Sequence, residues 1–257
     1  MTELSQHECD LFLLSSHQDY FADSALTRFA GRGSRNIHGW GIAGYHRGRA
    51  NVLRSADPAM DRCGGDLSRE FYMATKAVSS SIILGHLRFL SAGKVSEFNN
   101  HPFKLSFLGY DWTMVHNGTA ISHETLVPHN ERLLLESDND SARIFEFLRK
   151  RIIEYYLRDS RKSLIEGCRK AYADLLETDG GEFNIILSNG HISFVFIHHR
   201  TFYLLNRKKE MGDAALLSTL RLTDDEEWIA IEERQNKEAK MLVFSGPSLI
   251  FNGDIPR

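Results

Sequence analysis

The chain has 257 residues, of which 42% are hydrophobic and 25% are charged, a composition typical of globular proteins. Its formal net charge of -3 is small for this length and gives no electrostatic reason to expect nucleic acid or an anionic membrane as a partner. No apolar run approaches the roughly 20 residues of a membrane span, and the polar residues 1–10 include no signal-peptide stretch. We therefore expect a cytoplasmic protein that acts on a small polar metabolite.

Short apolar segments dominate the first half of the chain. Strands are predicted over residues 9–14, 39–45, 80–84 and 110–115, because each segment is mostly apolar or aromatic and ends at turn-prone residues. A helix is predicted over residues 66–78, where apolar positions recur mostly at helical spacing. The chain thus begins with mixed α and β structure.

Two consecutive helices are predicted in the middle of the chain. The first begins after Ser137, which suits an N-cap, and Asp138 suits the positive end of the helix dipole. The second covers residues 163–177, and strands follow at residues 183–187, 192–197, 202–205, 216–219, 228–231 and 241–244. Because strands do not alternate with helices, we expect an α+β fold of antiparallel sheets with helices outside, in one domain.

The three cysteines, Cys9, Cys63 and Cys168, are too few and too widely spaced for a disulfide framework, and none belongs to a zinc-binding Cys-x-x-Cys pair. One of them could therefore be a reactive thiol. Cys9 opens an apolar strand, where a cysteine taken alone is usually an inert core residue. Cys63 lies beside Arg62 in a Gly-rich segment, and Cys168 is expected in the core face of a helix.

Four polar clusters stand where predicted strands or helices begin or end, which is where a rigid scaffold presents reactive groups. In chain order they resemble the motifs of class II glutamine amidotransferases of the N-terminal-nucleophile (Ntn) hydrolase superfamily, especially small stand-alone ones. The matching residues are Cys9, His-Gly-Trp-Gly at 38–41, His-x-Arg at 86–88, Asn-x-His-Pro-Phe at 99–103, His-Asn-Gly at 116–118 and Ser-Asp at 137–138. The resemblance covers nearly all of residues 9–257 and implies a four-layer αββα sandwich of two antiparallel sheets.

Amide hydrolysis needs a nucleophile, a base, and donors aimed at the developing oxyanion. The resemblance implies that Cys9 is the nucleophile and that its own α-amino group, with an ordinary pKa near ~8, is the base once Cys9 is the first residue. It assigns the oxyanion hole to the Asn117 side chain and the Gly118 backbone N–H.

The resemblance also implies how glutamine would be held. Arg88 would bind the α-carboxylate of glutamine, for which a guanidinium fork is well shaped, and Asp138 would bind its α-ammonium group. Ser91 and His101 are further expected substrate contacts. The expected supporting residues are His38, Trp40, His86 and His116.

Each motif also has a structural interpretation. Asn117-Gly118 is a common hairpin turn signal, and Ser137-Asp138 is an ordinary helix cap. A metal site could be built from histidines at positions 86, 101 and 116, but their spacing lacks a helical His pair, and those at 198 and 199 would point to opposite faces of a strand. We therefore expect no metal and no cofactor.

Two departures from the family pattern bear on activity. Residues 1–8 precede Cys9, whereas stand-alone members usually begin Met-Cys, so we expect these residues to be a propeptide or an N-terminal extension. Leu90-Ser91 stands where the family usually has Ala-Thr. Ser91 keeps a hydroxyl for the substrate carboxylate, and Leu90 is bulkier.

Three functions remain open at this point. The first is glutamine hydrolysis through a Cys9 γ-glutamyl thioester, with ammonia released or passed to an accepting partner enzyme. The second is hydrolysis of a γ-glutamyl peptide or conjugate in the same pocket. The third is an unprocessed, non-catalytic binding domain. A small-molecule substrate is expected in the first two, and the sequence leaves open whether the chain forms a homo-oligomer.

Overall fold

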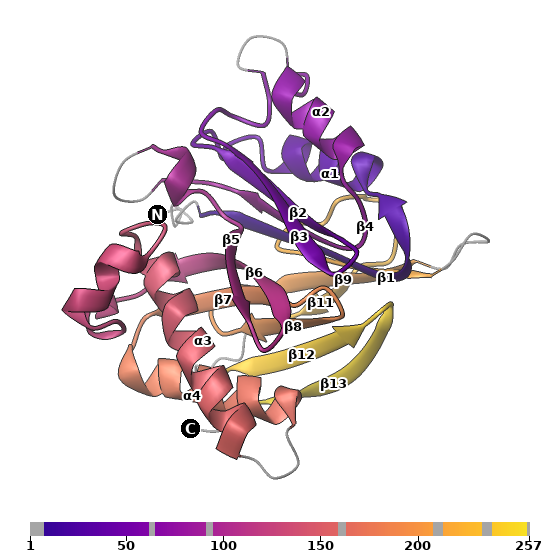
Figure 1. Cartoon of the computed structure of the whole chain (residues 1–257). Coiled ribbons are helices and arrows are strands. Elements are labelled where there is room, and N and C mark those ends of the chain that lie inside the picture. The colour runs from indigo at the N-terminus through magenta and orange to yellow at the C-terminus, as the bar shows by residue number, and fades with distance from the viewer. Residues whose placement is uncertain are drawn as a thin grey trace, which may run out of the picture.

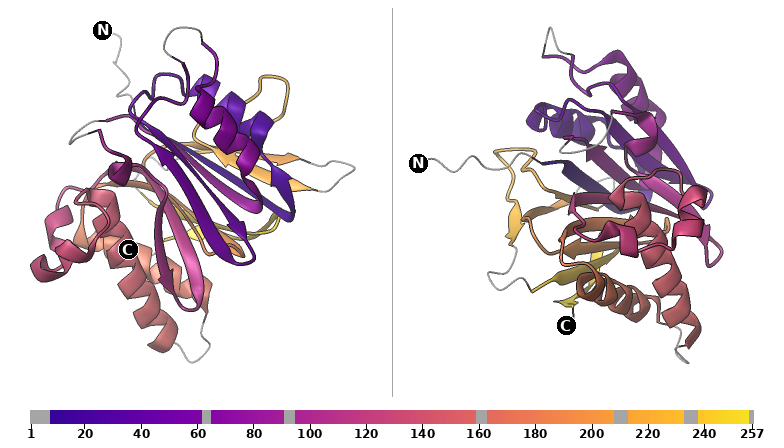
Figure 2. Two further views of the ribbon diagram at one scale, coloured as in Figure 1. Left: turned by 45° about the horizontal axis from the view of Figure 1, so that its top comes forward. Right: turned by 90° about the vertical axis from the view of Figure 1, so that its left-hand side faces the viewer.

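The computed structural model describes residues 8–61, 65–90, 95–158, 163–207, 213–232 and 238–255. Two antiparallel sheets face each other at the centre, and a pair of helices covers the outer face of each (Figures 1 and 2). This is the four-layer αββα arrangement expected for an Ntn hydrolase. No helix in the described ranges is both long and apolar enough to cross a membrane.

The first sheet consists of β1 (Asp10–Phe21), β2 (Trp40–His46), β3 (Arg49–Ser55), β4 (Ser79–Leu87), β9 (Phe202–Arg207), β10 (Ala214–Ser218) and β11 (Ile229–Ile231). Their spatial order is β11-β9-β10-β1-β4-β2-β3, and every pairing is antiparallel. The strand that follows Cys9 is therefore central, with β4 on one side and β10 on the other.

The second sheet consists of β5 (Phe103–Phe107), β6 (Tyr110–Thr119), β7 (Glu182–Ser188), β8 (Ile192–Ile197), β12 (Lys240–Ser245) and β13 (Ser248–Asp254). Their order is β13-β12-β8-β7-β6-β5, again antiparallel throughout. Asn117 of β6 lies opposite Asn184 of β7 in this register.

The outer layers are helical. The helices are α1 (Asp23–Arg32) and α2 (Arg69–Ala77) on the first sheet, and α3 (Asp140–Arg158) and α4 (Leu164–Thr178) on the second, with short 3-10 segments η1 (Glu97–Asn99), η2 (His123–Thr125) and η3 (His129–Leu134). The expectation that Ser137 caps the third helix is wrong. The Asn139 side chain accepts the N–H of Ala142 instead, while the Ser137 hydroxyl accepts the Asn139 N–H.

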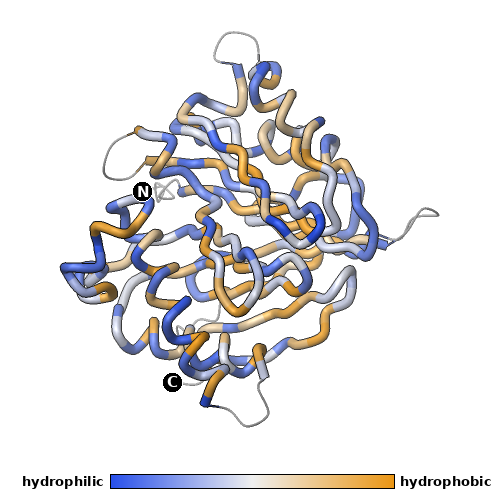
Figure 3. Tube along the Cα trace, in the orientation of Figure 1, coloured by the Kyte–Doolittle hydropathy of each residue, from blue (hydrophilic) through white to orange (hydrophobic). Residues whose placement is uncertain are grey.

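Three apolar layers separate the four structural layers, and β1 shows why. Because side chains alternate along a strand, Phe12 and Leu14 of β1 pack toward α1 and α2, whereas Leu11 and Leu13 pack toward the second sheet. Figure 3 shows the resulting apolar stretches along the central strands. Strands that are buried on both faces consist of continuous apolar runs, and these runs are what predicted the strands from the sequence.

Most predicted elements are confirmed within a few residues, and Cys168 is buried in α4 as expected. The α-helices and strands that were not predicted from the sequence are α1, β3, β5 and β13, and the three 3-10 segments were not predicted either. β1 is longer than predicted because polar residues follow its apolar start, and its pairing with β4 shifts between Ser15 and Tyr20. Cys63 lies outside the described residues.

Candidate active site

A cavity of about 540 Å³ lies where elements of both sheets and the start of α3 come together. Its lining includes seven of the residues singled out from the sequence: Cys9, His86, Arg88, His101, His116, Gly118 and Asp138. Asn117, His38 and Trp40 lie outside the lining, and Ser91 lies outside the described residues. Residues spread over 130 positions of the chain are thus brought to one cavity.

Cys9 immediately precedes β1 and is half-buried. Its Sγ donates to the Phe89 carbonyl oxygen at 3.4 Å and accepts the Phe89 N–H at 3.3 Å. Burial raises the pKa of the Cys9 thiol to about 11, and the negative charges of Asp10 and Glu8 act in the same direction, while Arg88 opposes them. In this chain, with residues ahead of Cys9, the thiol is therefore protonated at neutral pH.

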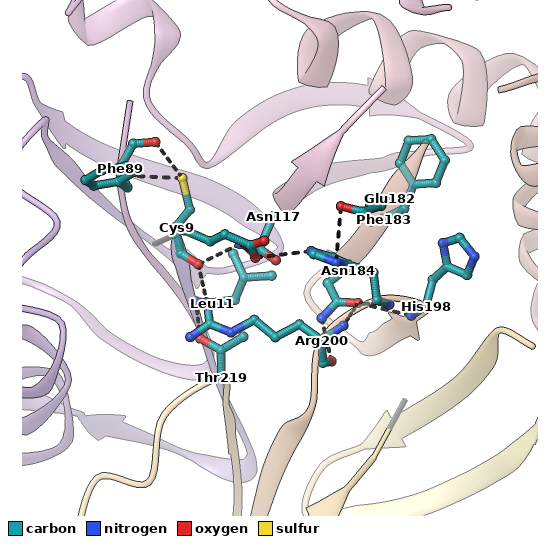
Figure 4. A network of polar contacts seen from close by, with 12 residues as sticks. Cys9, Leu11, Phe89, Asn117, Glu182, Phe183, Asn184, His198, Arg200 and Thr219 are labelled. Carbon is teal, nitrogen blue, oxygen red and sulfur yellow. Dashed lines mark hydrogen bonds and ion pairs between the residues drawn. The ribbon is translucent and has the colours of Figure 1, made fainter. Parts of the chain in front are cut away.

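Asn117 lies near the end of β6, beside Cys9. Its Nδ2 donates to the Cys9 carbonyl oxygen at 2.7 Å and to Glu8 Oε2 at 3.2 Å (Figure 4). A side-chain amide has two N–H bonds, so both donors are engaged by Glu8 and Cys9. The Asn117 Oδ1 atom is buried and has no hydrogen-bond partner among the described residues.

Gly118 is part of β6 rather than of a hairpin turn, because β6 continues to Thr119 and pairs with β7. Its φ of 130° lies in the region that favours glycine, and an added Cβ would meet the Glu182 carbonyl oxygen at 1.9 Å. The absence of a side chain therefore allows the close approach of β6 to β7 at the cavity wall.

Arg88 follows β4 and is 7% exposed. Its Nη1 donates at 3.2 Å to the Oδ1 atom of Asn100. The Nδ2 atom of Asn100 in turn donates to the Ser55 carbonyl oxygen at 2.5 Å, which fixes the amide. Burial lowers the pKa of Arg88, and the negative charge of Asp140 acts in the opposite direction. Because arginine stays protonated in proteins, the cavity keeps a fixed cation here.

Three buried histidines line the same cavity. The ring centroids of His86 and His101 are 4.3 Å apart, and those of His101 and His116 are 6.3 Å apart. Burial lowers the pKa of His86 to about 3 and the pKa of His101 well below its usual value, and Arg88 adds to both effects. These imidazoles are therefore neutral. His116 Nδ1 lies 2.9 Å from the Ser141 hydroxyl, which ties this ring to the start of α3.

His38 and Trp40, the two other residues expected to support the site, lie outside the cavity lining. His38 Nδ1 accepts the Leu90 N–H at 3.1 Å, and its ring meets the edge of Phe89 with centroids 5.5 Å apart. His38 thus holds the segment that contacts the Cys9 thiol. Trp40 is 3% exposed, and its ring centroid lies 5.1 Å from that of Phe71 on α2. Trp40 therefore belongs to the apolar layer between the first sheet and its helices.

A network around Asp10, which the sequence analysis did not assign, anchors the start of β1. The buried Asp10 carboxylate accepts from Asn36 Nδ2 at 2.7 Å and from the Thr219 hydroxyl at 2.9 Å, and it pairs with Arg200 at 2.9 Å. Arg200 Nη1 also donates to the Cys9 carbonyl oxygen at 2.8 Å (Figure 4). Arg200 comes from a turn without a recognisable motif, so the sequence offered no signal for it.

That turn corrects one expectation. His198 and His199 were predicted on opposite faces of a strand, but they lie between the ends of β8 and β9. The buried Asn184 side chain accepts the N–H groups of His198 at 3.0 Å and His199 at 3.2 Å, and it donates to the Arg200 carbonyl oxygen at 2.7 Å. An asparagine on β7 therefore fixes the turn that carries His199 and Arg200.

In the described ranges, one group of side chains has potential ligand atoms close enough to one another to bind a single metal ion. Atoms of Glu8, Glu182 and His199 lie within 4.8 Å of one another. They are accounted for by close contacts between the imidazole and the two carboxylates, because His199 Nε2 is 3.1 Å from Glu8 Oε2 and His199 Nδ1 is 3.4 Å from Glu182 Oε2. The three cavity histidines do not form such a group in the described part of the chain.

Comparison with a family profile and with a related sequence points to the same family. The profile of the family described as "Glutamine amidotransferases class-II" matches residues 8–252. Escherichia coli (strain K12) YafJ, which carries a provisional glutamine amidotransferase name, is 25% identical over 198 residues, covering 77% of this chain and 74% of YafJ.

Two solved structures share the fold. A predicted glutamine amidotransferase from Pseudomonas aeruginosa PA01 superposes with a TM-score of 0.63 at 20% identity, covering 95% of this chain and all of that one. Glutamine phosphoribosylpyrophosphate amidotransferase from B. subtilis gives a TM-score of 0.65 at 15% identity, with 96% of this chain covered. This chain spans 49% of that enzyme.

Proposed function

Because the chain belongs to the class II glutamine amidotransferases, we propose that it hydrolyses the side-chain amide of glutamine with Cys9 as nucleophile. The observation that carries the proposal is the cavity of about 540 Å³. Its lining joins a thiol, a fixed cation, a carboxylate and the Gly118 backbone. Those are the groups that binding and cleaving a zwitterionic glutamyl amide requires.

The reaction has two steps. The Cys9 sulfur adds to the side-chain carbonyl carbon of glutamine, a C–S bond forms, and the C–N bond breaks as the nitrogen takes a proton and leaves as ammonia. Water then adds to the thioester carbon, which releases glutamate and restores the thiol. The Asn117 amide and the Gly118 N–H would stabilise the oxyanion in both steps, and losing one such donor typically costs ~10²–10³ in rate.

The substrate would be oriented by its charged end. Arg88 would bind the α-carboxylate and Asp138 the α-ammonium group, with Ser91 and His101 as further contacts. The buried Arg88 supports this role, because a guanidinium held by Asn100 keeps a fixed orientation. His38, His86 and His116 would support the surrounding segments as neutral hydrogen-bonding or packing groups.

The mature enzyme would begin at Cys9. A free α-amino group can take the thiol proton, whereas the amide nitrogen of an internal Cys9 cannot. The raised pKa of Cys9 supports this requirement, because the unprocessed chain holds little thiolate at neutral pH. Residues 1–8 would then be a propeptide, and residues 9–257 the catalytic domain. The ammonia would be released or passed to an accepting partner enzyme.

A γ-glutamyl peptide or conjugate is a second candidate substrate, and the size of the cavity favours it. About 540 Å³ lies within the range of roughly 300–1,000 Å³ for pockets that hold drug-sized ligands, which are larger than free glutamine. The same Arg88 and Asp138 would hold the glutamyl end, and the remaining volume would hold the leaving group.

Steady-state assays of a chain that begins at Cys9 test the function. We expect ammonia release from glutamine in this chain, its loss in Cys9→Ala, and a KM increase of about tenfold or more in Arg88→Lys, which keeps the charge but not the fork. Competition between glutamine and γ-glutamyl dipeptides ranks the two substrate classes by kcat/KM. No hydrolysis of either class by a folded chain beginning at Cys9 would leave the non-catalytic binding domain as the function.

A further inference from the structure

Glu8, the residue before the proposed nucleophile Cys9, occupies a defined binding site. Two side chains converge on a single oxygen of Glu8, because His199 Nε2 lies 3.1 Å from Oε2 and Asn117 Nδ2 donates to the same atom at 3.2 Å. The pair is partly withdrawn from water, with the Glu8 side chain 24% and the His199 side chain 12% exposed. Water therefore screens this contact less than it screens a contact on the open surface.

The charge of Glu8 fits this site. Burial alone would raise the pKa of Glu8, but hydrogen bonds from His199 and Asn117 and the nearby charge of Arg200 bring it below its usual value. Glu8 is therefore ionised at neutral pH. The docked group is a carboxylate, and the donors around it are those that a carboxylate needs.

The site is rigid because other residues hold its donors in place. Asn184 fixes the β8–β9 turn through hydrogen bonds with the backbone of His198, His199 and Arg200. Asn117 lies opposite Asn184 on the neighbouring strand. The two side chains that contact Glu8 therefore come from a strand of the second sheet and from a turn that a strand of the same sheet fixes.

The peptide bond between Glu8 and Cys9 is anchored on both sides. On the Cys9 side, the carbonyl oxygen accepts from Asn117 at 2.7 Å and from Arg200 at 2.8 Å. On the other side, the Glu8 carboxylate is held by His199 and Asn117. Two anchors around one bond restrict its rotation and keep it in one place relative to the cavity, which is how positioning accelerates a reaction.

We propose that His199 and Asn117 form a recognition site for an acidic residue preceding the nucleophile, and that Glu8 docked there positions the Glu8–Cys9 bond for the hydrolysis that releases Cys9. In that hydrolysis water adds across the C–N bond: the carbonyl carbon of Glu8 gains the hydroxyl, and the nitrogen of Cys9 gains the proton. Glu8 and His199 are thus specificity and positioning residues for maturation. This proposal rests on the proposed function, in which Cys9 must become the first residue.

Maturation is measured by intact mass, as the fraction of purified full chain that begins at Cys9 over time. Glu8→Ala and His199→Ala should each slow it by about tenfold or more, since each removes the contact between His199 and the charged Glu8 side chain. Glu8→Gln keeps an acceptor without the charge and should fall between Glu8→Ala and the unsubstituted chain. Glu177→Ala, an exposed glutamate on α4, is the control and should mature at the unsubstituted rate.

The double variant separates docking from a general structural effect. If the two side chains act through their contact, Glu8→Ala with His199→Ala should mature no more slowly than either single variant. If the double variant is slowed by the product of the two single-variant factors, the proposal is overturned. Unchanged maturation in Glu8→Ala, or a full chain that never matures, would also overturn it. Thermal unfolding of each variant shows whether it is folded, and Glu8→Gln keeps the test decisive if His199→Ala does not fold.

Failure of this proposal is distinguishable from failure of the proposed function. A chain expressed to begin at Cys9 has no Glu8, so its glutamine hydrolysis does not depend on the Glu8 contact. If that chain is active while Glu8→Ala matures normally, only the recognition site is wrong. If maturation depends on Glu8 while that chain hydrolyses no glutamine, only the proposed function is wrong.

Discussion

The side chain of Asn117 donates from Nδ2 to the carbonyl oxygen of Cys9 across 2.7 Å. This bond ties the end of β6 in one sheet to the start of β1 in the other, at the residue proposed as nucleophile. The second N–H of the same amide is used by Glu8. Loss of Glu8 would free one donor beside the nucleophile without loosening the bond to Cys9.

Removing the Asn117 amide should therefore impair catalysis more than substrate binding. In a chain that begins at Cys9, Asn117→Ala is expected to lower kcat for glutamine by ~10²–10³ with a much smaller change in KM, because an oxyanion donor acts in the transition state. Asn117→Asp, which is similar in shape but carries a charge, should also lower kcat. A variant with normal kcat would remove Asn117 from the oxyanion hole.

The Cys9 thiol of the unprocessed chain should react slowly with alkylating reagents. A pKa of about 11 instead of 9.0 reduces the thiolate fraction at neutral pH by about 100-fold, and the thiolate is the reactive species. We expect the iodoacetamide rate at Cys9, followed by peptide mass spectrometry, to rise up to about pH 11. A rate equal to that of an exposed cysteine at pH 8 would contradict this description of the site.

Gly118 should tolerate no side chain. Gly118→Ala places a Cβ 1.9 Å from the Glu182 carbonyl oxygen at a φ of 130°, so we expect a loss of at least about 1–3 kcal/mol in the free energy of unfolding. Gly180→Ala is the matched control, because an added Cβ there meets nothing within 4 Å, and it should change stability by less than about 0.5 kcal/mol. Urea unfolding measures both. Equal stability of the two variants would refute the close approach.

The buried histidines should make the protein less stable as the pH falls. His86 and His101 stay neutral in the folded state, whereas the unfolded chain takes up their protons below about pH 6.5. Stability is therefore full above that pH and is lost as the pH falls below it, for His86 until the pH reaches about 3. Each would cost about 1.4 kcal/mol for every pH unit below about 6.5. His86→Gln should reduce the slope of the unfolding free energy against pH, below about pH 6.5, by about 1.4 kcal/mol per pH unit. An unchanged slope would indicate that His86 can be protonated in the folded protein.

The sequence was informative about the fold where strands are buried on both faces. The apolar runs that became β1, β6, β7 and β8 were recognised from composition, while β13 was missed because most of its residues are exposed at a sheet edge. The four-layer arrangement came from the family resemblance, since periodicity alone does not say how two sheets stack.

The sequence was informative about the site where motifs are local. His-Gly-Trp-Gly marks a place where the His101 carbonyl oxygen would lie 2.0 Å from a Cβ on Gly41, so glycine is required there. The roles of His199 and Arg200 were not predictable, because they depend on the turn that links β8 of the second sheet to β9 of the first meeting the start of β1. No spacing along the chain reports such a contact between sheets.

The central claim is that Cys9 attacks a glutamyl amide once it is the first residue. A glutamine analogue with a reactive diazoketone in place of the amide tests it most directly, with the site of attachment located by mass spectrometry. The chain that begins at Cys9 should be labelled at Cys9 alone, at a rate that excess glutamine suppresses, and the unprocessed chain should remain unlabelled. Attachment at another residue, labelling that glutamine does not suppress, or equal labelling of the unprocessed chain would contradict the claim.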